Sequence, residues 1–162
     1  MSFDQVPPIP VFLLEVEARP DDEGQLVRAE IQQGNARDEL VLFDNYSRVD
    51  PAWVGQVCNA YLYTYLYRIQ RQFNEVRQEI VPGSFFRVTL YGQMNEIAQG
   101  DFQDRSVPDI KHNFMIDTGI GGITVFAELK HLREMDGVRF GDYVELRPAF
   151  PSLLYIEELA CS

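Results

Sequence analysis

Hydrophobic and polar residues alternate along the first third of the chain. In "QLVRAEIQQ" (25–33), apolar residues fall mainly at every second position, and polar residues fall mostly between them. This two-residue period is typical of a β-strand with one buried face. Apolar stretches at 11–18 and 39–44 flank it, and turn-forming residues separate the three stretches. The pattern predicts an antiparallel β-meander over 10–45.

The segment 50–80 fits two secondary structures. It begins with Asp-Pro, which is typical of a helix start, and its apolar residues recur every three or four positions. The same segment also alternates, with four tyrosines on one side of an extended backbone and Leu62, Thr64 and Leu66 on the other. Tyrosine favours strands, whereas the lack of a turn signal favours a helix. We expect a long strand or a hairpin here, with one long helix as the alternative.

Short apolar stretches separated by glycine-rich turns fill the C-terminal β segment, 82–160. Further strands are expected at 122–130, 140–150 and 152–160. Many short strands of this kind are typical of a sandwich or a small barrel. The sequence therefore predicts a mainly β fold, an antiparallel small barrel or sandwich. The length is that of a single compact domain, 1–162.

Three motifs resemble oligonucleotide/oligosaccharide-binding-type (OB-type) small barrels. They are "PGSFFRVTLYGQM", "MIDTGIGGITVF" and "FGDYVELRPAF", and they lie within 82–159, about half of the chain. In such barrels a Gly-Asp pair often turns into a strand with the pattern Tyr-Val-Glu-Leu. The resemblance implies an OB-like barrel over this part of the chain. It implies no particular function, because barrels of this type serve many functions.

The chain carries a net charge of −11, which is concentrated toward its two ends. Residues 1–50 include eleven acidic and four basic residues. Residues 51–100 include three acidic and four basic residues, and residues 101–162 include eleven acidic and six basic residues. Such an acidic surface repels phosphate backbones and attracts basic partners. No apolar run is long enough for a membrane helix, and the start lacks the features of a signal peptide. We expect a cytoplasmic protein, and the scarcity of lysine among its cations favours a GC-rich bacterial genome.

The tripeptide Asp-Thr-Gly at 117–119 resembles the active-site loop of aspartic proteases. That chemistry needs two carboxylates that share a proton. The chain contains one such tripeptide, followed by Ile120 where the family usually has a small residue. The glycines within 119–122 are not followed by a helix start, which a phosphate loop requires. Asp117 and these glycines instead predict a hairpin turn. No catalytic residue is predicted, and we expect the protein not to be an enzyme.

The histidines and cysteines form no recognisable metal site. His112 and His131 each stand beside a lysine, without a second ligand at the spacing that zinc sites use. Cys58 and Cys161 are far apart in the sequence, and we expect a buried thiol and a terminal thiol rather than a disulfide. No metal and no cofactor are predicted.

One segment combines aromatic and basic residues, and it is the candidate binding site. Its residues are Tyr61, Tyr63, Tyr65, Tyr67, Arg68 and Arg71. We expect the tyrosines to pack in the barrel with their hydroxyl groups reaching its rim. A protein-binding face is the second interpretation, because exposed tyrosine and arginine are favoured anchors of protein interfaces. Stacking on single-stranded nucleic acid is the third.

The function expected from these features is that of a non-enzymatic acidic binding module with a protein partner. A basic partner would complement its charge, and an immunity protein or an inhibitor of a basic target fits this profile. The alternative is an OB-type protein that binds single-stranded nucleic acid through 61–77. No membrane partner is expected, and the sequence leaves the oligomeric state open.

Overall fold

The structure is mainly β. This computed structural model describes residues 6–20, 23–84, 86–97, 110–128 and 137–158, with the backbone alone at 110–112 and 128. The strands are β1 (Ile9–Ala18), β2 (Gln25–Gln33), β3 (Ala36–Asp44), β4 (Val57–Tyr65), β5 (Ile69–Arg71), β6 (Glu79–Pro82), β7 (Val88–Glu96), β8 (Ile110–Asp117), β9 (Gly122–Glu128), β10 (Tyr143–Ala149) and β11 (Ser152–Glu158). The described residues contain no α-helix, only the short 3₁₀ turn η2 (Pro51–Trp53). The predicted fold class is confirmed.

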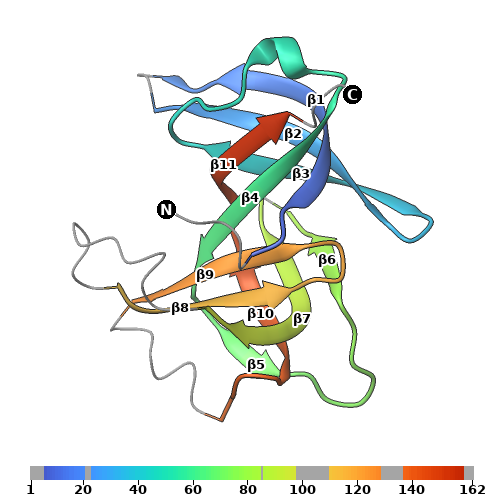
Figure 1. The fold of residues 1–162 in the computed structure, drawn as a ribbon, viewed down its shortest axis with the longest axis vertical. Helices are drawn as coiled ribbons and strands as arrows, with labels where there is room; N and C mark the ends of the chain where they lie inside the picture. Colours follow the sequence, from blue (N-terminus) through green and yellow to red (C-terminus); the bar gives the residue numbers. More distant parts are fainter. Residues whose placement is uncertain (1–5, 21–22, 85, 98–109, 129–136, 159–162) are drawn as a thin grey trace.

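Five strands close into a small barrel (Figure 1). β1, β2 and β3 form the predicted antiparallel meander. β4 pairs antiparallel with the other edge of β1. β11 lies between β4 and β3, antiparallel to β4 and parallel to β3, which it meets at Ser152 and Phe43. The ring therefore runs β1-β2-β3-β11-β4 and returns to β1, which makes it a mixed barrel.

Additional strands continue the sheet from the second half of β4. Residues 57–60 of β4 pair with β1, whereas residues 62–65 pair in parallel with β9. The sheet then continues through β8, β7, β10 and β5, and β6 pairs with β7. In Figure 1, β4 runs from the ring in the upper part of the view to these added strands in the lower part. β4 is therefore the strand that the two parts share.

Residues 50–80 form strands, so the preferred interpretation is confirmed and the helix alternative is wrong. Asp-Pro does start a helical turn, since the Asp50 carboxylate accepts a hydrogen bond of 2.9 Å from the Ala52 backbone N–H. This turn, η2, ends after three residues and does not extend into a helix. β4 and β5 follow, separated by a turn at 66–68. The three- and four-residue spacing of apolar residues arises across separate elements and does not reflect one helix.

The barrel occupies a different part of the chain from the one expected. The motifs within 82–159 lie largely in the added strands β7 to β10, and of these residues only β11 enters the ring. The ring takes its other four strands from the first 65 residues. Turn motifs do not distinguish ring strands from inserted ones, because closure depends on pairing between residues far apart in the sequence.

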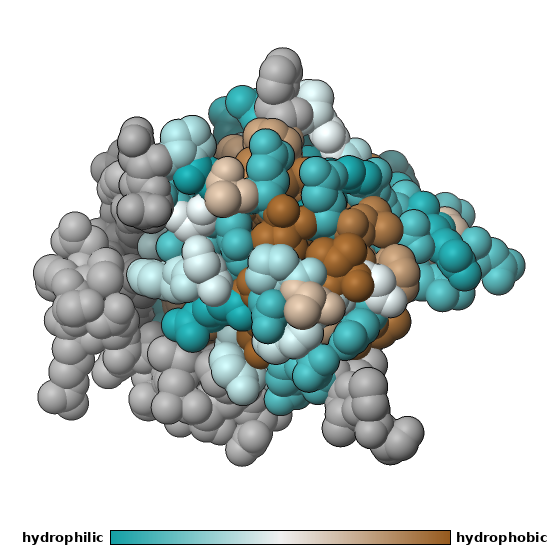
Figure 2. Space-filling view, turned by 90° about the horizontal axis from the view of Figure 1, so that it is seen from above, coloured by the Kyte–Doolittle hydropathy of each residue, from teal (hydrophilic) through white to brown (hydrophobic). Residues whose placement is uncertain are grey.

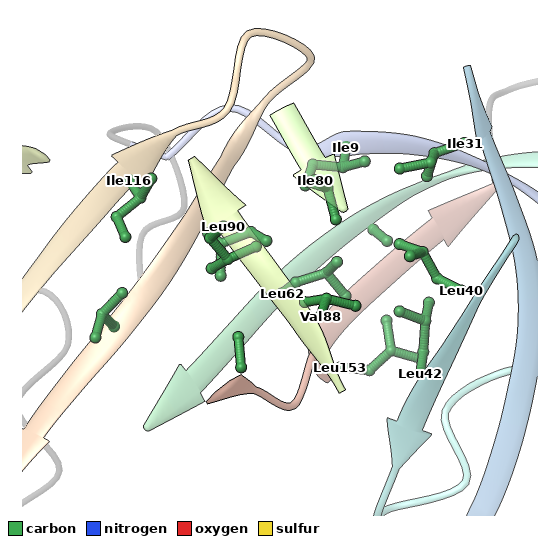
Figure 3. Close-up of a cluster of buried hydrophobic side chains, with 14 of the residues drawn as sticks. Ile9, Ile31, Leu40, Leu42, Leu62, Ile80, Val88, Leu90, Ile116 and Leu153 are labelled. Atoms are coloured by element: carbon green, nitrogen blue, oxygen red, sulfur yellow. The ribbon is translucent and has the colours of Figure 1, made fainter. Parts of the chain in front are cut away.

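One continuous apolar core fills the ring and extends under the added strands. Val27, Ala29 and Ile31 of β2 are buried, as the alternation predicts. Leu62 of the ring and Leu90 of β7 belong to the same buried cluster, which Figure 3 shows. Because burial of apolar side chains is the main favourable term in folding, the ring and the added strands stabilise each other.

Candidate functional site

β4 directs its tyrosines outward, so the expectation that they pack inside the barrel is wrong. Tyr61 and Tyr63 are half-buried on the outer face, and Tyr65 is exposed. The buried residues that alternate with them are smaller: Cys58, Ala60, Leu62 and Thr64. A five-strand barrel has a narrow interior, which accepts these side chains in place of a row of phenol rings.

Aromatic residues of two neighbouring strands extend this row. Tyr155 of β11 is paired with Tyr61, and their ring centroids are 5.8 Å apart. Phe126 of β9 lies 5.3 Å from Tyr63 and 6.0 Å from Tyr65, centroid to centroid. These five residues, Tyr61, Tyr63, Tyr65, Phe126 and Tyr155, are called the tyrosine strip. The strip crosses the outer face of three adjacent strands.

A carboxylate borders the tyrosine strip. The Tyr61 hydroxyl donates a hydrogen bond of 3.2 Å to Glu157 Oε1, and Glu158 follows as an exposed residue at the end of β11. Tyr65 and Tyr155 are 37% and 38% exposed. The surface thus presents aromatic rings beside negative charge, a combination that attracts cationic side chains.

Tyr67 belongs to a different surface. The chain turns after β4, Leu66 is buried, and the Tyr67 ring packs against Phe150 with centroids 5.6 Å apart. The ring centroids of Phe150 and Phe43 are 6.4 Å apart, and those of Phe43 and Phe86 are 6.1 Å apart. These four rings, Tyr67, Phe150, Phe43 and Phe86, form a second aromatic cluster. The predicted row of four tyrosines is therefore divided between two places.

Three arginines that stand close in the sequence to aromatic residues of this cluster line one groove of about 400 Å³. Arg68 follows Tyr67 in the β4–β5 turn, Arg87 follows Phe86 in the β6–β7 loop, and Arg147 lies on β10. The other lining residues are Gly83, Ser84, Val88, Thr89 and Pro148. No acidic side chain is among the described residues that line this arginine groove, although the chain as a whole is strongly acidic.

The three guanidinium groups differ in how far their charge is compensated. Arg68 and Arg87 form no ion pair with any described residue. Arg147 Nε lies 3.4 Å from Glu145 Oε1, and Glu145 Oε2 accepts a hydrogen bond of 2.9 Å from Gln70 Nε2. Arginine stays protonated at all physiological pH values. The groove therefore carries at least two uncompensated positive charges.

Of the two arginines predicted from sequence, the structure places one in the groove. Arg71 is exposed on β5 and does not line it. Sequence analysis missed Arg87 and Arg147, which come from segments far from Arg68. The available signal was an arginine close to an aromatic residue in each segment, as in "YR", "FR" and "RPAF".

The Asp-Thr-Gly tripeptide forms the predicted hairpin turn between β8 and β9. Asp117 Oδ1 accepts a hydrogen bond of 2.9 Å from the Gly119 N–H, and the Thr118 N–H and hydroxyl both donate to the Gly121 carbonyl. Gly119 and Gly121 adopt positive φ angles of 91° and 149°, which glycine tolerates without steric cost. The hairpin interpretation is confirmed, and the absence of catalysis stays a prediction.

Cys58 is fully buried in the core. Burial, and then the negative charge of Glu158, raises the pKa of its thiol, so that the thiol stays protonated at neutral pH. Cys161, His131 and the side chain of His112 lie outside the described residues. Within the described part of the chain, no three His, Cys, Asp or Glu side chains are grouped to hold a metal ion. The same residues include no helix that is long and apolar enough to cross a membrane.

Hydrophobic residues gather on the face of the molecule shown in Figure 2, near the middle of the view, with hydrophilic residues around them. Phe12 of β1 and Val57 of β4 are exposed, paired partners, and both line a hollow of about 320 Å³. No feature of this hollow specifies the chemistry of a partner.

Comparison of the chain with protein-family models, with curated proteins and with solved structures found no match. The function must therefore be inferred from the surfaces described above.

Proposed function

We propose that this protein is a non-enzymatic binding module of the OB type that binds a basic protein through the tyrosine strip. The order of the ring strands supports the OB-type assignment. A three-strand meander is closed by one strand antiparallel to its first and one parallel to its third, as expected for a five-strand Greek-key barrel. Barrels of this type are general binding scaffolds, so the ligand is argued from the surface.

The observation that carries the proposal is the outward alignment of Tyr61, Tyr63 and Tyr65 on β4. Large apolar side chains on an outer face leave the water only when another surface covers them. Tyrosine contributes a large contact area with few rotatable bonds and is common among the residues that dominate binding energy. Phe126 and Tyr155 widen the strip to three strands, which suits a protein surface better than a small ligand.

Charge points to a basic partner. Glu157 lies at the border of the strip, and the chain carries a net charge of −11. Arginine and lysine side chains of a partner would stack on the tyrosine rings and pair with this carboxylate. An inhibitor or an immunity protein of a basic target would use such a surface.

The test begins with affinity capture from a cell extract and continues with each captured protein in purified form. Each purified partner is titrated against three forms of this protein. These are the wild type, a Tyr63→Ser/Tyr65→Ser double variant and a Phe73→Ser control. Phe73 is a 70% exposed aromatic residue outside the strip. We expect the double variant to bind at least about 10-fold more weakly, because residues that dominate an interface each contribute about 2 kcal/mol or more. The control should bind like the wild type, and affinity should fall as salt rises.

Equal binding by the wild type and the double variant would reject the strip as the interface. A purified partner that is acidic, or that binds independently of salt, would reject the role of charge.

A further inference from the structure

We propose that the arginine groove binds single-stranded nucleic acid. Arg68, Arg87 and Arg147 would contact backbone phosphates, and the rings of Tyr67 and Phe86 would stack on bases. This inference goes beyond the proposed function, because it concerns a different surface and a different class of ligand.

The composition of the groove is the first observation. Three distant segments each contribute one arginine to a hollow of about 400 Å³, and its other polar side chains are the hydroxyl-bearing Ser84 and Thr89. Guanidinium groups bind phosphate oxygens in a bidentate manner, and hydroxyl groups add further hydrogen bonds. A concentration of arginines without acidic lining residues is unusual in a chain with 25 acidic residues.

The position of the aromatic residues is the second observation. Tyr67 and Phe86 directly precede Arg68 and Arg87, so two of the arginines each adjoin an aromatic ring in the chain. The two rings are 41% and 47% exposed. Tyr67 packs on Phe150 and Phe86 packs on Phe43 in edge-on geometry, which holds both rings at the surface.

The backbone of the β6–β7 loop is the third observation. Phe86 has a φ angle of 66°, a left-handed conformation that a bulky residue rarely adopts. Such strain persists where the surrounding structure enforces it, and it is found mainly at functional sites. Hydrogen bonds of Gly83 N–H to Arg87 O (2.8 Å) and of Arg87 N–H to Ser84 O (3.3 Å) close the loop. Phe86 directly precedes Arg87, and Ser84 and Arg87 of the same loop line the arginine groove.

These features favour a single strand over other anions. An acidic peptide would satisfy the arginines but gives no reason for the adjoining aromatic rings. A duplex keeps its bases stacked inside, whereas a single strand offers them to aromatic side chains. The net charge of the chain weakens binding but does not prevent it, because exposed charges are screened beyond roughly 8–10 Å at physiological salt. We therefore expect a dissociation constant of about 1–100 μM near 0.1 M salt, the range of non-specific binding.

Fluorescence anisotropy tests the proposal. The probe is a labelled oligothymidylate of about 15 nucleotides, a length that covers a site of this size. The wild type is compared with Arg68→Glu/Arg87→Glu, and with Arg71→Glu and Arg37→Glu as single charge reversals outside the groove. The double variant should bind at least about 10-fold more weakly, and each control should stay within about twofold. Three phosphate contacts predict a roughly 20-fold loss for the wild type between about 50 and 200 mM salt. Circular dichroism checks that each variant is folded.

The Phe86→Gly variant tests the stacking contact separately from folding. Glycine accepts the positive φ at this position, so the variant should stay folded while oligonucleotide affinity falls at least about threefold. Unchanged affinity would overturn the stacking of bases on Phe86 and leave the arginine–phosphate contacts as the proposed means of binding.

Competition distinguishes the possible ligands. Unlabelled oligothymidylate should displace the probe at concentrations where inorganic phosphate and polyglutamate do not. Equal displacement by polyglutamate would assign the groove to an acidic protein segment instead. The proposal is also overturned if the wild type does not bind at about 50 mM salt, or if Arg71→Glu weakens binding as much as the double variant.

Discussion

The side-chain amide of Gln33 pairs with the backbone of Ile80 as a neighbouring strand would. Gln33 Oε1 accepts a hydrogen bond of 2.7 Å from the Ile80 N–H, and Gln33 Nε2 donates one of 2.8 Å to the Ile80 carbonyl. Gln33 ends β2 of the ring, and Ile80 lies in β6 of the added strands. The amide therefore satisfies the edge of β6 that β7 leaves unpaired, and it joins the two parts of the molecule.

Replacing Gln33 by leucine should loosen this connection. Gln33→Leu leaves the Ile80 N–H and carbonyl without partners, and Ile80 is fully buried, so we expect a loss of about 1–3 kcal/mol in the free energy of unfolding. Urea denaturation measures this loss, and hydrogen exchange should show faster exchange of the Ile80 amide. Gln32→Leu is the matched control, because among the described residues the Gln32 amide makes one exposed hydrogen bond, of 3.3 Å to Gly34. Unchanged protection of the Ile80 amide in Gln33→Leu would contradict the connection.

Asp117 is predicted to act as a turn residue. Asp117→Ala removes the acceptor of the Gly119 N–H and should cost about 1 kcal/mol, the usual contribution of one hydrogen bond. Asp117→Asn keeps a side-chain carbonyl that can accept the same bond, so it should cost less. Chemical denaturation of both variants gives the comparison. An enzymatic activity that disappears in Asp117→Asn without a change in melting temperature would show that the residue is catalytic.

The buried thiol of Cys58 should make stability fall at alkaline pH. Its folded-state pKa is raised above the ordinary value of 9.0, so the unfolded chain loses this proton first as the pH rises. The stabilising contribution is therefore fully present below about pH 9 and is lost between 9.0 and the folded-state pKa, by up to about 1.4 kcal/mol per pH unit. Urea unfolding of the wild type and Cys58→Ala at about pH 7 and pH 10 should show a stability difference that shrinks at the higher pH. A constant difference would contradict the raised pKa.

The local parts of the fold followed from the sequence because they depend on neighbouring residues. Alternation in 25–33 and the turn chemistry around Asp117 predicted β2 and the β8–β9 hairpin. The alternation of β4 was also visible, but which side faces inward depends on the width of a ring that closes through β1 and β11. The smaller size of Cys58 and Ala60 compared with the tyrosines was the signal that could have decided it.

The arginine groove was predictable only in part. Arg68 lies beside Tyr67 and stood out in the sequence, whereas Arg87 and Arg147 are single cations in strand-like segments. They come together because β10 pairs with β7 and β5, a long-range arrangement that no local pattern records. Because Arg71 is close to Arg68 in the sequence, it was predicted to be the second cation of the site. In the structure, Arg87 and Arg147 line the groove together with Arg68, and Arg71 does not.

Removing the acidic neighbour of the groove should strengthen nucleic-acid binding. Glu145 lies 3.4 Å from Arg147 and is the described carboxylate that compensates one of the three arginines. Glu145→Gln removes this competing charge, and its side-chain carbonyl can still accept the hydrogen bond from Gln70. The Arg147 side chain of this pair is exposed and that of Glu145 is half-buried. Ion pairs at the surface contribute about 0.2–1 kcal/mol, so oligonucleotide affinity should rise by about 1.5- to 5-fold.

Glu157→Gln is the matched control, because it makes the same charge change at the tyrosine strip. It should leave oligonucleotide affinity unchanged and weaken binding of a basic partner, since the two ligands are assigned to separate surfaces. Anisotropy titrations of both variants at the same salt concentration give the comparison. An equal rise in oligonucleotide affinity in both variants would show that net charge, rather than the arrangement of Arg68, Arg87 and Arg147, controls binding. A rise confined to Glu145→Gln would place a phosphate contact at Arg147, the arginine that Glu145 compensates.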